Sequence, residues 1–257
     1  MRRPLFKIAV ALGAAAFLAA APASPRAAEA EPPPSIPFSF KGLFGTFDRA
    51  SAQRGLQVYM EVCANCHGLR QLSYRNLTEL GLSEAEVRAI AATVQVQDGP
   101  NDEGQMFERP GRPSDRFRSP FPNAMAARAA NNGAYPPDLS VMVKARAGGA
   151  DYLYALLVGY SDPPQGVELM QGMHYNRYFP GQQIAMAPPL NPGQVSFHDG
   201  TEATVEQMAR DVTTFLAWAA EPELEERRAL GVKIVLFLTI LGGLVYAVKR
   251  KVWGEAH

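Results

Sequence analysis

The sequence contains very few of the residues that bind metal ions through nitrogen or sulfur. It has two cysteines, Cys63 and Cys66, and four histidines in 257 residues. A structural zinc site needs four such ligands, and the histidines other than His67 show no paired spacing, so the sequence argues against zinc. A thioredoxin-like cysteine pair would require a βαβ context, and the sequence predicts none.

The sequence also lacks an excess of positive charge. It carries 25 Lys and Arg residues and 25 Asp and Glu residues. Between residues 31 and 228 the counts are 17 and 23, which gives this segment a net charge of 17 − 23 = −6. An acidic segment argues against nucleic-acid binding, and it suits either a basic protein partner or ordinary solubility.

The N-terminal residues have the layout of a secretory signal peptide. Residues 1–7 are basic, residues 8–23 are apolar and rich in alanine, and residues 28–30 fit an A-x-A cleavage site. We predict a signal peptide over residues 1–28, with cleavage between 23 and 30. The alternative is an uncleaved anchor, for which the apolar run is short, because a span needs about 20 apolar residues.

A second apolar run predicts a membrane span near the C-terminus. Residues 229–248 contain one charge, Lys233, near the start of the run, where its stem can reach the interface. The run has the length of a transmembrane helix, and a buried core helix is the alternative. Because positive charge stays on the cytoplasmic side, the basic residues 249–251 predict that residues 249–257 form a cytoplasmic tail. Residues 29–228 then form a periplasmic domain of a single-pass protein in a bacterial inner membrane.

The pattern between these ends is mainly helical. Periodic apolar residues and start signals predict helices over residues 51–62, 83–94, 123–131, 139–147, 151–160 and 204–220, and a further helix that begins at Pro222 and leads into the span. Residues 97–121 and 161–200 are rich in Pro and Gly and predict long loops. Such loops are unusual in a compact domain unless something other than strands organises them.

Residues 63–67 carry the most specific motif in the chain. They read Cys-Ala-Asn-Cys-His, the C-x-x-C-H attachment signature of c-type haem. Two thiols about one helical turn apart can each add to one vinyl group of the same porphyrin, and the adjacent imidazole is then held under the iron. Because the motif occurs once, we predict a single covalently attached haem c, with Cys63 and Cys66 as attachment sites and His67 as an axial ligand.

The ligand on the other face of the iron is less well defined by pattern. Met186 is a candidate, because prolines just after its sulfur stiffen the chain. Most methionines fill apolar cores, and His174 and His198 are rivals in polar loop sequence. A Met/His ligand pair would raise the reduction potential relative to two imidazoles.

Arg128 is the lone charge in the alanine-rich helix predicted over residues 123–131. A guanidinium turned inward can pair with a planar carboxylate such as a haem propionate. A guanidinium on the solvated face of the helix is the alternative reading.

Several segments together resemble the cytochrome c1 family. They are residues 54–59 ahead of the cysteine pair, 130–140 (ANNGAYPPDLS), 175–181 (YNRYFPG), 184–190 (IAMAPPL) and 218–222 (WAAEP). The resemblance covers the whole chain after the signal peptide, and the combination is more specific than the haem motif alone.

The resemblance implies that His67 and Met186 are the axial ligands, that Arg128 pairs with a propionate, and that Pro137 lies in the segment that contacts the haem. It implies a cytochrome c-like helical core with long loop insertions. It also implies assembly with cytochrome b and a Rieske iron–sulfur protein in a homodimeric, membrane-embedded bc1 complex. Some bacterial members have an extra cysteine pair ahead of the axial methionine. This chain has none, so turns and packing must hold residues 161–181.

These features predict an electron-transfer subunit without a substrate turnover site of its own. One electron would pass from the Rieske protein to a soluble or anchored c-type cytochrome, in respiratory or photosynthetic electron transport, while both ligands stay on the iron. A haem peroxidase or reductase, or a haem-based gas sensor, would need an exchangeable ligand position, and the methionine segment argues against both.

Overall fold

The computed structural model describes residues 30–254. The predicted signal peptide and residues 255–257 lie outside the described residues. The helices are α2 (Arg49–Glu61), η1 (Cys63–Asn65), η2 (Tyr74–Leu80), α3 (Glu84–Ala92), α4 (Ala124–Ala130), α5 (Met142–Ala145), α6 (Gly149–Val158), α7 (Val205–Ala220) and α8 (Leu224–Gly254). Two antiparallel ribbons pair β1 (Gln95–Asp98) with β2 (Phe107–Pro110) and β3 (His174–Tyr175) with β4 (Gln183–Ile184). The fold is mainly α, as predicted.

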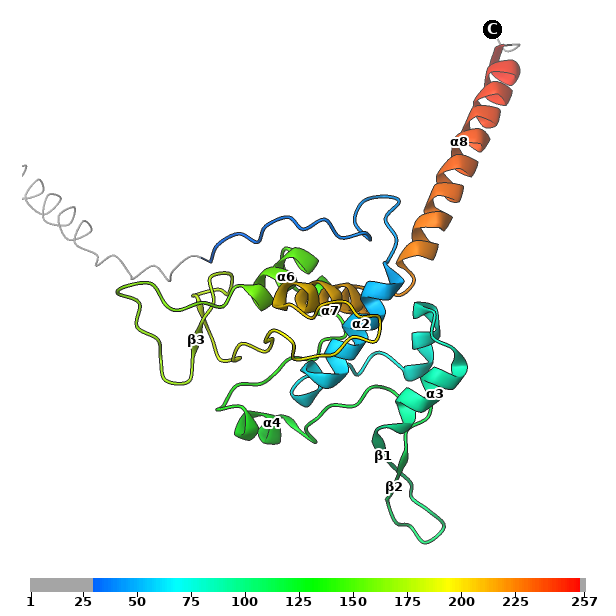
Figure 1. Ribbon diagram of the computed structural model, residues 1–257. Coiled ribbons are helices and arrows are strands. Elements are labelled where there is room, and N and C mark those ends of the chain that lie inside the picture. Colours follow the sequence, from blue (N-terminus) through cyan, green and yellow to red (C-terminus); the bar gives the residue numbers. More distant parts are fainter. Residues whose placement is uncertain (1–29, 255–257) are drawn as a thin grey trace, which may run out of the picture.

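The core of the domain is built where α2 crosses α7 (Figure 1). Gly55 lies at the crossing, and a Cβ at this position would lie 2.0 Å from the backbone oxygen of Asp211. Only glycine therefore allows the two helices to approach so closely. Tyr59 of α2 and Phe215 and Trp218 of α7 are almost completely buried beside the crossing. Their rings pack with centroids 5.8 to 5.9 Å apart, so the crossing is the anchor point of the aromatic core.

A buried ion pair joins the same two helices. The Asp211 side chain is 0% exposed and accepts hydrogen bonds from Nε and Nη2 of Arg54, at 2.8 and 3.1 Å. The same carboxylate also accepts from Ser51 Oγ at 2.6 Å and from Gln207 Nε2 at 3.0 Å. Burying a charge is costly unless it is paired and hydrogen-bonded, and here both carboxylate oxygens have partners.

Side-chain caps start the helices where the sequence predicts them. Ser83 and Glu86 form both hydrogen bonds of a capping box ahead of α3. The side chains of Asn123 and Thr204 accept backbone N–H groups at the starts of α4 and α7. These bonds satisfy N–H groups that have no partner within the helix, so the helix starts follow from local sequence.

Four of the predicted segments differ from the structure. The predicted loops 97–121 and 161–200 contain strand residues, because β1 pairs with β2 and β3 pairs with β4. The predicted helix 139–147 shrinks to the single turn of α5, with Gly148 in the left-handed conformation beyond it. The final helix begins at Leu224 and not at Pro222, and a turn occupies the residues between them.

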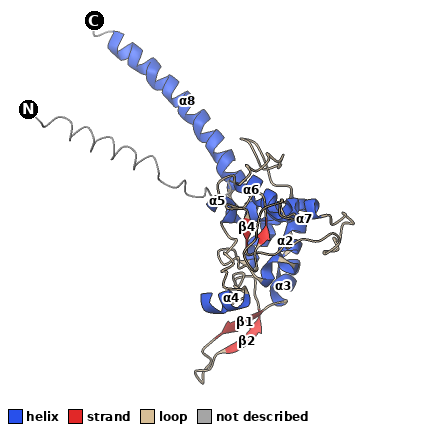
Figure 2. Cartoon of the chain, turned by 90° about the vertical axis from the view of Figure 1, so that its left-hand side faces the viewer, coloured by secondary structure: helices blue, strands red, loops and turns tan. Residues whose placement is uncertain are grey.

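Helix α8 leaves the domain as a single long rod (Figures 1 and 2). It is 31 residues long, and none of its most apolar stretch is buried within the described residues. A buried core helix is thereby ruled out as the reading of this segment. By length and composition α8 is suited to span a membrane.

Candidate functional site

The two cysteines lie in a tight turn just after α2. The N–H groups of Cys66 and His67 both donate to the carbonyl oxygen of Cys63, at 3.1 and 2.8 Å. Asn65 Nδ2 donates to the carbonyl oxygens of Glu61 and Val62 at the end of α2, at 3.1 and 3.2 Å. The turn thus brings both thiols and the imidazole into one compact unit at the helix end.

Both cysteines are free thiols. Burial, with a smaller contribution from Cys66, raises the pKa of the Cys63 thiol to about 12. A redox-active cysteine requires a lowered pKa and a reactive thiolate. The surroundings of Cys63 therefore do not suit thiol–disulfide exchange, in agreement with the interpretation of the pair as attachment sites.

His67 is oriented by a hydrogen bond between its Nδ1 and the carbonyl oxygen of Pro137, at 2.8 Å. A carbonyl can only accept, so Nδ1 carries the proton and Nε2 keeps its lone pair free for a metal. Burial lowers the pKa of His67, and the hydrogen bond to Pro137 offsets this only in part. The imidazole is therefore neutral at neutral pH, which is the form that binds iron.

The Pro137 carbonyl is held in place because the chain after His67 pairs with the chain after Pro137. The contacts are Leu139 N to Gly68 O at 2.8 Å, Arg70 N to Asp138 Oδ2 at 3.0 Å, and Gln71 N to Ser140 Oγ at 3.0 Å. A Cβ at Gly68 would lie 2.9 Å from Asp138 Oδ2, so a larger residue would crowd this carboxylate.

Asp138 is the centre of that pairing. Its Oδ1 accepts from the N–H and the hydroxyl of Ser140, and its Oδ2 accepts from the N–H and Nε of Arg70. Burial alone would raise the pKa of Asp138, but these hydrogen bonds outweigh burial and lower it. Asp138 is therefore a stable carboxylate at neutral pH.

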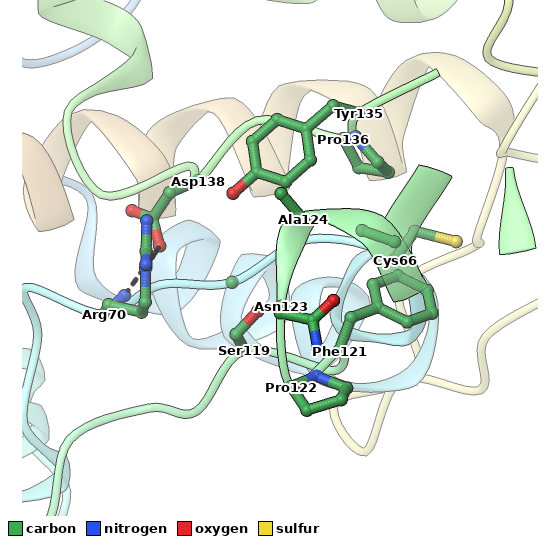
Figure 3. A pocket seen from close by; sticks show the side chains of 12 residues that line it. Cys66, Arg70, Ser119, Phe121, Pro122, Asn123, Ala124, Tyr135, Pro136 and Asp138 are labelled. Carbon is green, nitrogen blue, oxygen red and sulfur yellow. Dashed lines mark hydrogen bonds and ion pairs between the residues drawn. The ribbon is translucent and has the colours of Figure 1, made fainter. Parts of the chain in front are cut away.

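A cavity of about 280 Å³ opens beside Cys66. Figure 3 shows Cys66, Phe121 and Tyr135 around this cavity, with the Arg70–Asp138 pair at another side. Its lining is Cys66, Gly68, Arg70, Ser119, Phe121, Pro122, Asn123, Ala124, Ala127, Tyr135, Pro136 and Asp138. Aromatic, proline and alanine side chains next to an attachment thiol fit an apolar planar group bound through Cys66.

Arg128 lies at the border of this cavity. It is exposed on α4, its Nη1 donates to the carbonyl oxygen of Gly133 at 2.9 Å, and its guanidinium lies over the Tyr135 ring, 5.6 Å from the centroid. Because Tyr135 lines the cavity, the guanidinium is fixed close to it. Within the described residues, the only hydrogen bond of this side chain is the one to Gly133.

Met186 lies in the segment that follows β4 and is half-buried. The hydroxyl of Tyr160 donates to the backbone oxygen of Met186 at 3.0 Å. Burial raises the pKa of Tyr160, so the phenol keeps the proton that it donates. The backbone of Tyr160 forms an isolated antiparallel β-bridge with Asn176. The buried side-chain amide of Asn176 donates to the carbonyl oxygen of Leu156 at 2.8 Å. These contacts tie the methionine segment to the end of α6.

The rival histidines occupy different surroundings. His174 lies in β3 opposite Ile184, and His198 is exposed in the loop before α7. The sequence pattern did not single out Phe121 or Tyr160, which the structure places at the cavity and at the methionine segment. Phe121 lies in a predicted loop and Tyr160 at a helix end, so periodicity carried no signal for either.

Comparison with known proteins agrees with this geometry. The sequence profile described as "Cytochrome C1 family" matches residues 38–256. The chain is 47% identical over 234 residues to "Cytochrome c1" of Rhodospirillum rubrum, covering 85% of this chain and 86% of that protein. It is 54% identical over 207 residues to "Cytochrome c1-2, heme protein, mitochondrial" of Solanum tuberosum, covering 80% of each.

A longer relative matches as well. The chain is 51% identical over 247 residues to "Cytochrome b/c1" of Bradyrhizobium diazoefficiens, and the match covers 88% of this chain but 36% of that protein. The family profile covers the haem motif, the cavity and the methionine segment together. The chain therefore belongs to the cytochrome c1 family.

Proposed function

We propose that this chain is the c-type cytochrome subunit of a bc1 complex and that it carries one electron at a time on a single haem c. The observation that carries the proposal is the turn at residues 63–67 in a member of the cytochrome c1 family. There two thiols lie next to an imidazole whose Nε2 is left free by the bond from Nδ1 to Pro137. This arrangement suits covalent attachment and axial ligation of one haem.

The remaining site residues have distinct roles in this proposal. Cys63 and Cys66 would attach the porphyrin, and His67 and Met186 would supply the protein ligands of its iron. Pro137 keeps His67 in one tautomer and one orientation. Arg128 offers a positive charge for a propionate at the cavity border, next to Tyr135. When bound, the haem supplies a reversible one-electron couple.

In this proposal, electron transfer requires no change in the protein ligands of the iron. Two fixed ligands would keep reorganisation small, and the chain needs no proton donor or substrate pocket of its own. The proposed electron donor is a Rieske iron–sulfur protein and the proposed acceptor is a soluble or anchored c-type cytochrome. The name of the Bradyrhizobium relative joins cytochrome b to cytochrome c1, which supports cytochrome b as a neighbour in a homodimeric complex.

The topology follows from the two ends of the chain. We assign residues 1–28 to a signal peptide, 29–228 to the haem domain on the periplasmic side, 229–248 to the span and 249–257 to the cytoplasmic tail. The exposed apolar surface of α8 supports the span. The basic residues 249–251 support the orientation.

The experiment that tests the function uses membranes containing the assembled complex. Addition of quinol is expected to reduce the haem of this chain, and removal of the Rieske protein should leave it oxidised. Reduction at an unchanged rate without the Rieske protein would contradict the proposed electron path. Carbon monoxide and cyanide at neutral pH should leave the spectrum unchanged. Binding of either would favour an enzyme or a gas sensor with an open iron position.

A further inference from the structure

Two large apolar side chains point into solvent on a loop that precedes α2. Leu43 is 66% exposed and Phe44 is 79% exposed. The aromatic residues on either side of them in the chain behave in the opposite way. Phe40 and Phe47 are buried, and their ring centroids lie 5.1 Å apart. The loop of residues 41–46 therefore leaves the core, exposes two apolar residues and returns.

The shape of this loop is fixed by close backbone packing. Gly42 has a φ of +79°, which glycine adopts without strain. A Cβ at Gly45 would lie 2.1 Å from the carbonyl oxygen of Lys41. Nη1 of Arg228 donates to the carbonyl oxygens of Phe40 and Gly45, at 2.8 Å each, and so closes the neck of the loop. The exposure of Leu43 and Phe44 is thus a built feature of the fold.

The loop lies against the N-terminal turns of α8. Leu43 and Phe44 share a shallow cleft with Ala229 and Val232 of the helix. Figure 1 shows the blue segment ahead of α2 rising beside the lower end of α8. In the first turn of α8, the Glu225 carboxylate accepts hydrogen bonds from the N–H of Phe47 at 2.7 Å and from Nη2 of Arg49 at 3.0 Å. Hydrogen bonds therefore join the loop and the residues just after it to the first turns of α8.

The level of the loop along α8 indicates what covers it. The apolar run of α8 begins at Ala229, and Val232 lies about 4.5 Å further along the helix, at 1.5 Å per residue. Val232 belongs to the proposed span, so Leu43 and Phe44, which share a cleft with it, lie at the level where that span begins. Their apolar surface is continuous with that of the span. In water this surface would be unfavourable, by about 25 cal/mol for each Å².

We propose that Leu43 and Phe44 insert among the lipid acyl chains of the leaflet from which α8 emerges. The proposal rests on the membrane anchoring by α8 that is part of the proposed function. A single helix fixes the domain at one point and leaves its tilt free. A second contact beside the helix fixes the height and the tilt of the haem domain above the membrane, which sets how the cavity is presented to partners.

The test uses the full-length haem-containing chain in nanodiscs whose phospholipids carry a photoreactive diazirine in the acyl chain. After illumination, mass spectrometry is expected to find lipid adducts on the peptide that contains Leu43 and Phe44, as well as on α8. Met125 and Met170 are 80% and 65% exposed and serve as matched controls that should remain unlabelled. The double variant Leu43→Ser, Phe44→Ser should reduce labelling of the loop to the level of these controls.

Each outcome is decisive. Labelled α8 with an unlabelled loop would overturn the proposal while leaving the membrane anchor intact. Unlabelled α8 would contradict the anchor itself. The same experiment on the assembled complex separates lipid from protein as the occupant. A loop labelled in the isolated chain but protected in the complex would show that a neighbouring subunit covers it, and this would also overturn the proposal. An unchanged haem spectrum in the double variant verifies its folding.

Discussion

Nδ1 of His67 donates to the carbonyl oxygen of Pro137 at 2.8 Å, across 70 residues of sequence. This bond selects the tautomer whose Nε2 is free to bind iron. The carbonyl oxygen has a fixed position because Asp138, the next residue, is hydrogen-bonded to Arg70 and Ser140. The orientation of the proposed iron ligand thus depends on a carboxylate that does not touch it.

Replacing Asp138 with Asn should destabilise the domain in a pH-dependent way. Loss of a charged acceptor with several partners should lower the free energy of unfolding by about 1 to 3 kcal/mol at neutral pH. The pKa of Asp138 is lowered in the folded protein. Its stabilising effect is therefore fully present above the ordinary carboxyl pKa and is lost as the pH falls through the folded value.

Chemical denaturation at several pH values tests this prediction. The difference in unfolding free energy between wild type and Asp138→Asn should be constant near pH 7 and should shrink below about pH 4. The exposed Asp162→Asn change is the matched control and should show little effect at any pH. A difference in unfolding free energy that grows on acidification would contradict the conclusion that Asp138 stabilises the domain as an ionised carboxylate.

Removing Asp211 should unfold the domain much more readily than removing a surface charge. Asp211→Ala leaves Arg54, Ser51 and Gln207 without their common acceptor, and breaking such a buried pair costs about 3 to 5 kcal/mol. Arg88→Gln removes the exposed pair with Glu84, which should cost at most about 0.5 kcal/mol. Urea titration of both variants in detergent measures the contrast, and equal effects would show that the buried pair contributes little.

Gly55→Ala should separate α2 from α7. The added methyl group would lie 2.0 Å from the backbone oxygen of Asp211, and neither backbone can give way without disturbing the aromatic core. The expected cost is about 3 kcal/mol, at the upper end for overpacking. A methyl group added at Gly242 in α8 would meet no atom of the described residues within 4 Å, so Gly242→Ala is a control that should preserve the melting temperature. A Gly55→Ala protein as stable as wild type would mean that the crossing is more adaptable than its geometry indicates.

Arg128→Gln should lower the reduction potential of the haem. A positive charge close to the haem favours the state with the added electron, so its removal favours the oxidised state. A solvent-exposed unit charge contributes about 1 kcal/mol at 4 Å, which corresponds to roughly 40 mV for one electron. Arg146→Gln, at the exposed end of α5, should leave the potential unchanged in the same redox titration. A rise in potential, or equal effects of both changes, would exclude Arg128 as the propionate partner.

The elements that sequence predicts well are those specified by neighbouring residues. The capping residues Ser83 and Thr204 mark the starts of α3 and α7 because their partners lie three residues further along the chain. The haem motif is contiguous and is read directly. The hairpin of β1 and β2 was not predicted. Its pairing is stabilised by Arg109, which forms ion pairs with Asp98 and Asp115, and such contacts leave no local periodicity in the sequence.

The supporting contacts of the site were harder to predict for the same reason. The bond from Tyr160 to Met186 joins residues that are 26 apart, and the contact between Arg70 and Asp138 joins residues that are 68 apart. No local periodicity encodes such contacts. The sequence left an inward and a solvated guanidinium open at position 128, and in the structure the side chain is exposed on α4 and packs over Tyr135 at the cavity border.

The ligand assignment is tested most directly by the absorption spectrum and redox titration of the purified full-length protein, with Met186→Leu beside wild type. Met170→Leu, at a position 65% exposed, is the matched control. Wild type and control should be low-spin and six-coordinate, with the weak far-red band of sulfur–iron ligation. Met186→Leu should lose that band together with a large part of the reduction potential. A high-spin wild type, or a Met186→Leu protein with an unchanged spectrum and potential, would contradict the account.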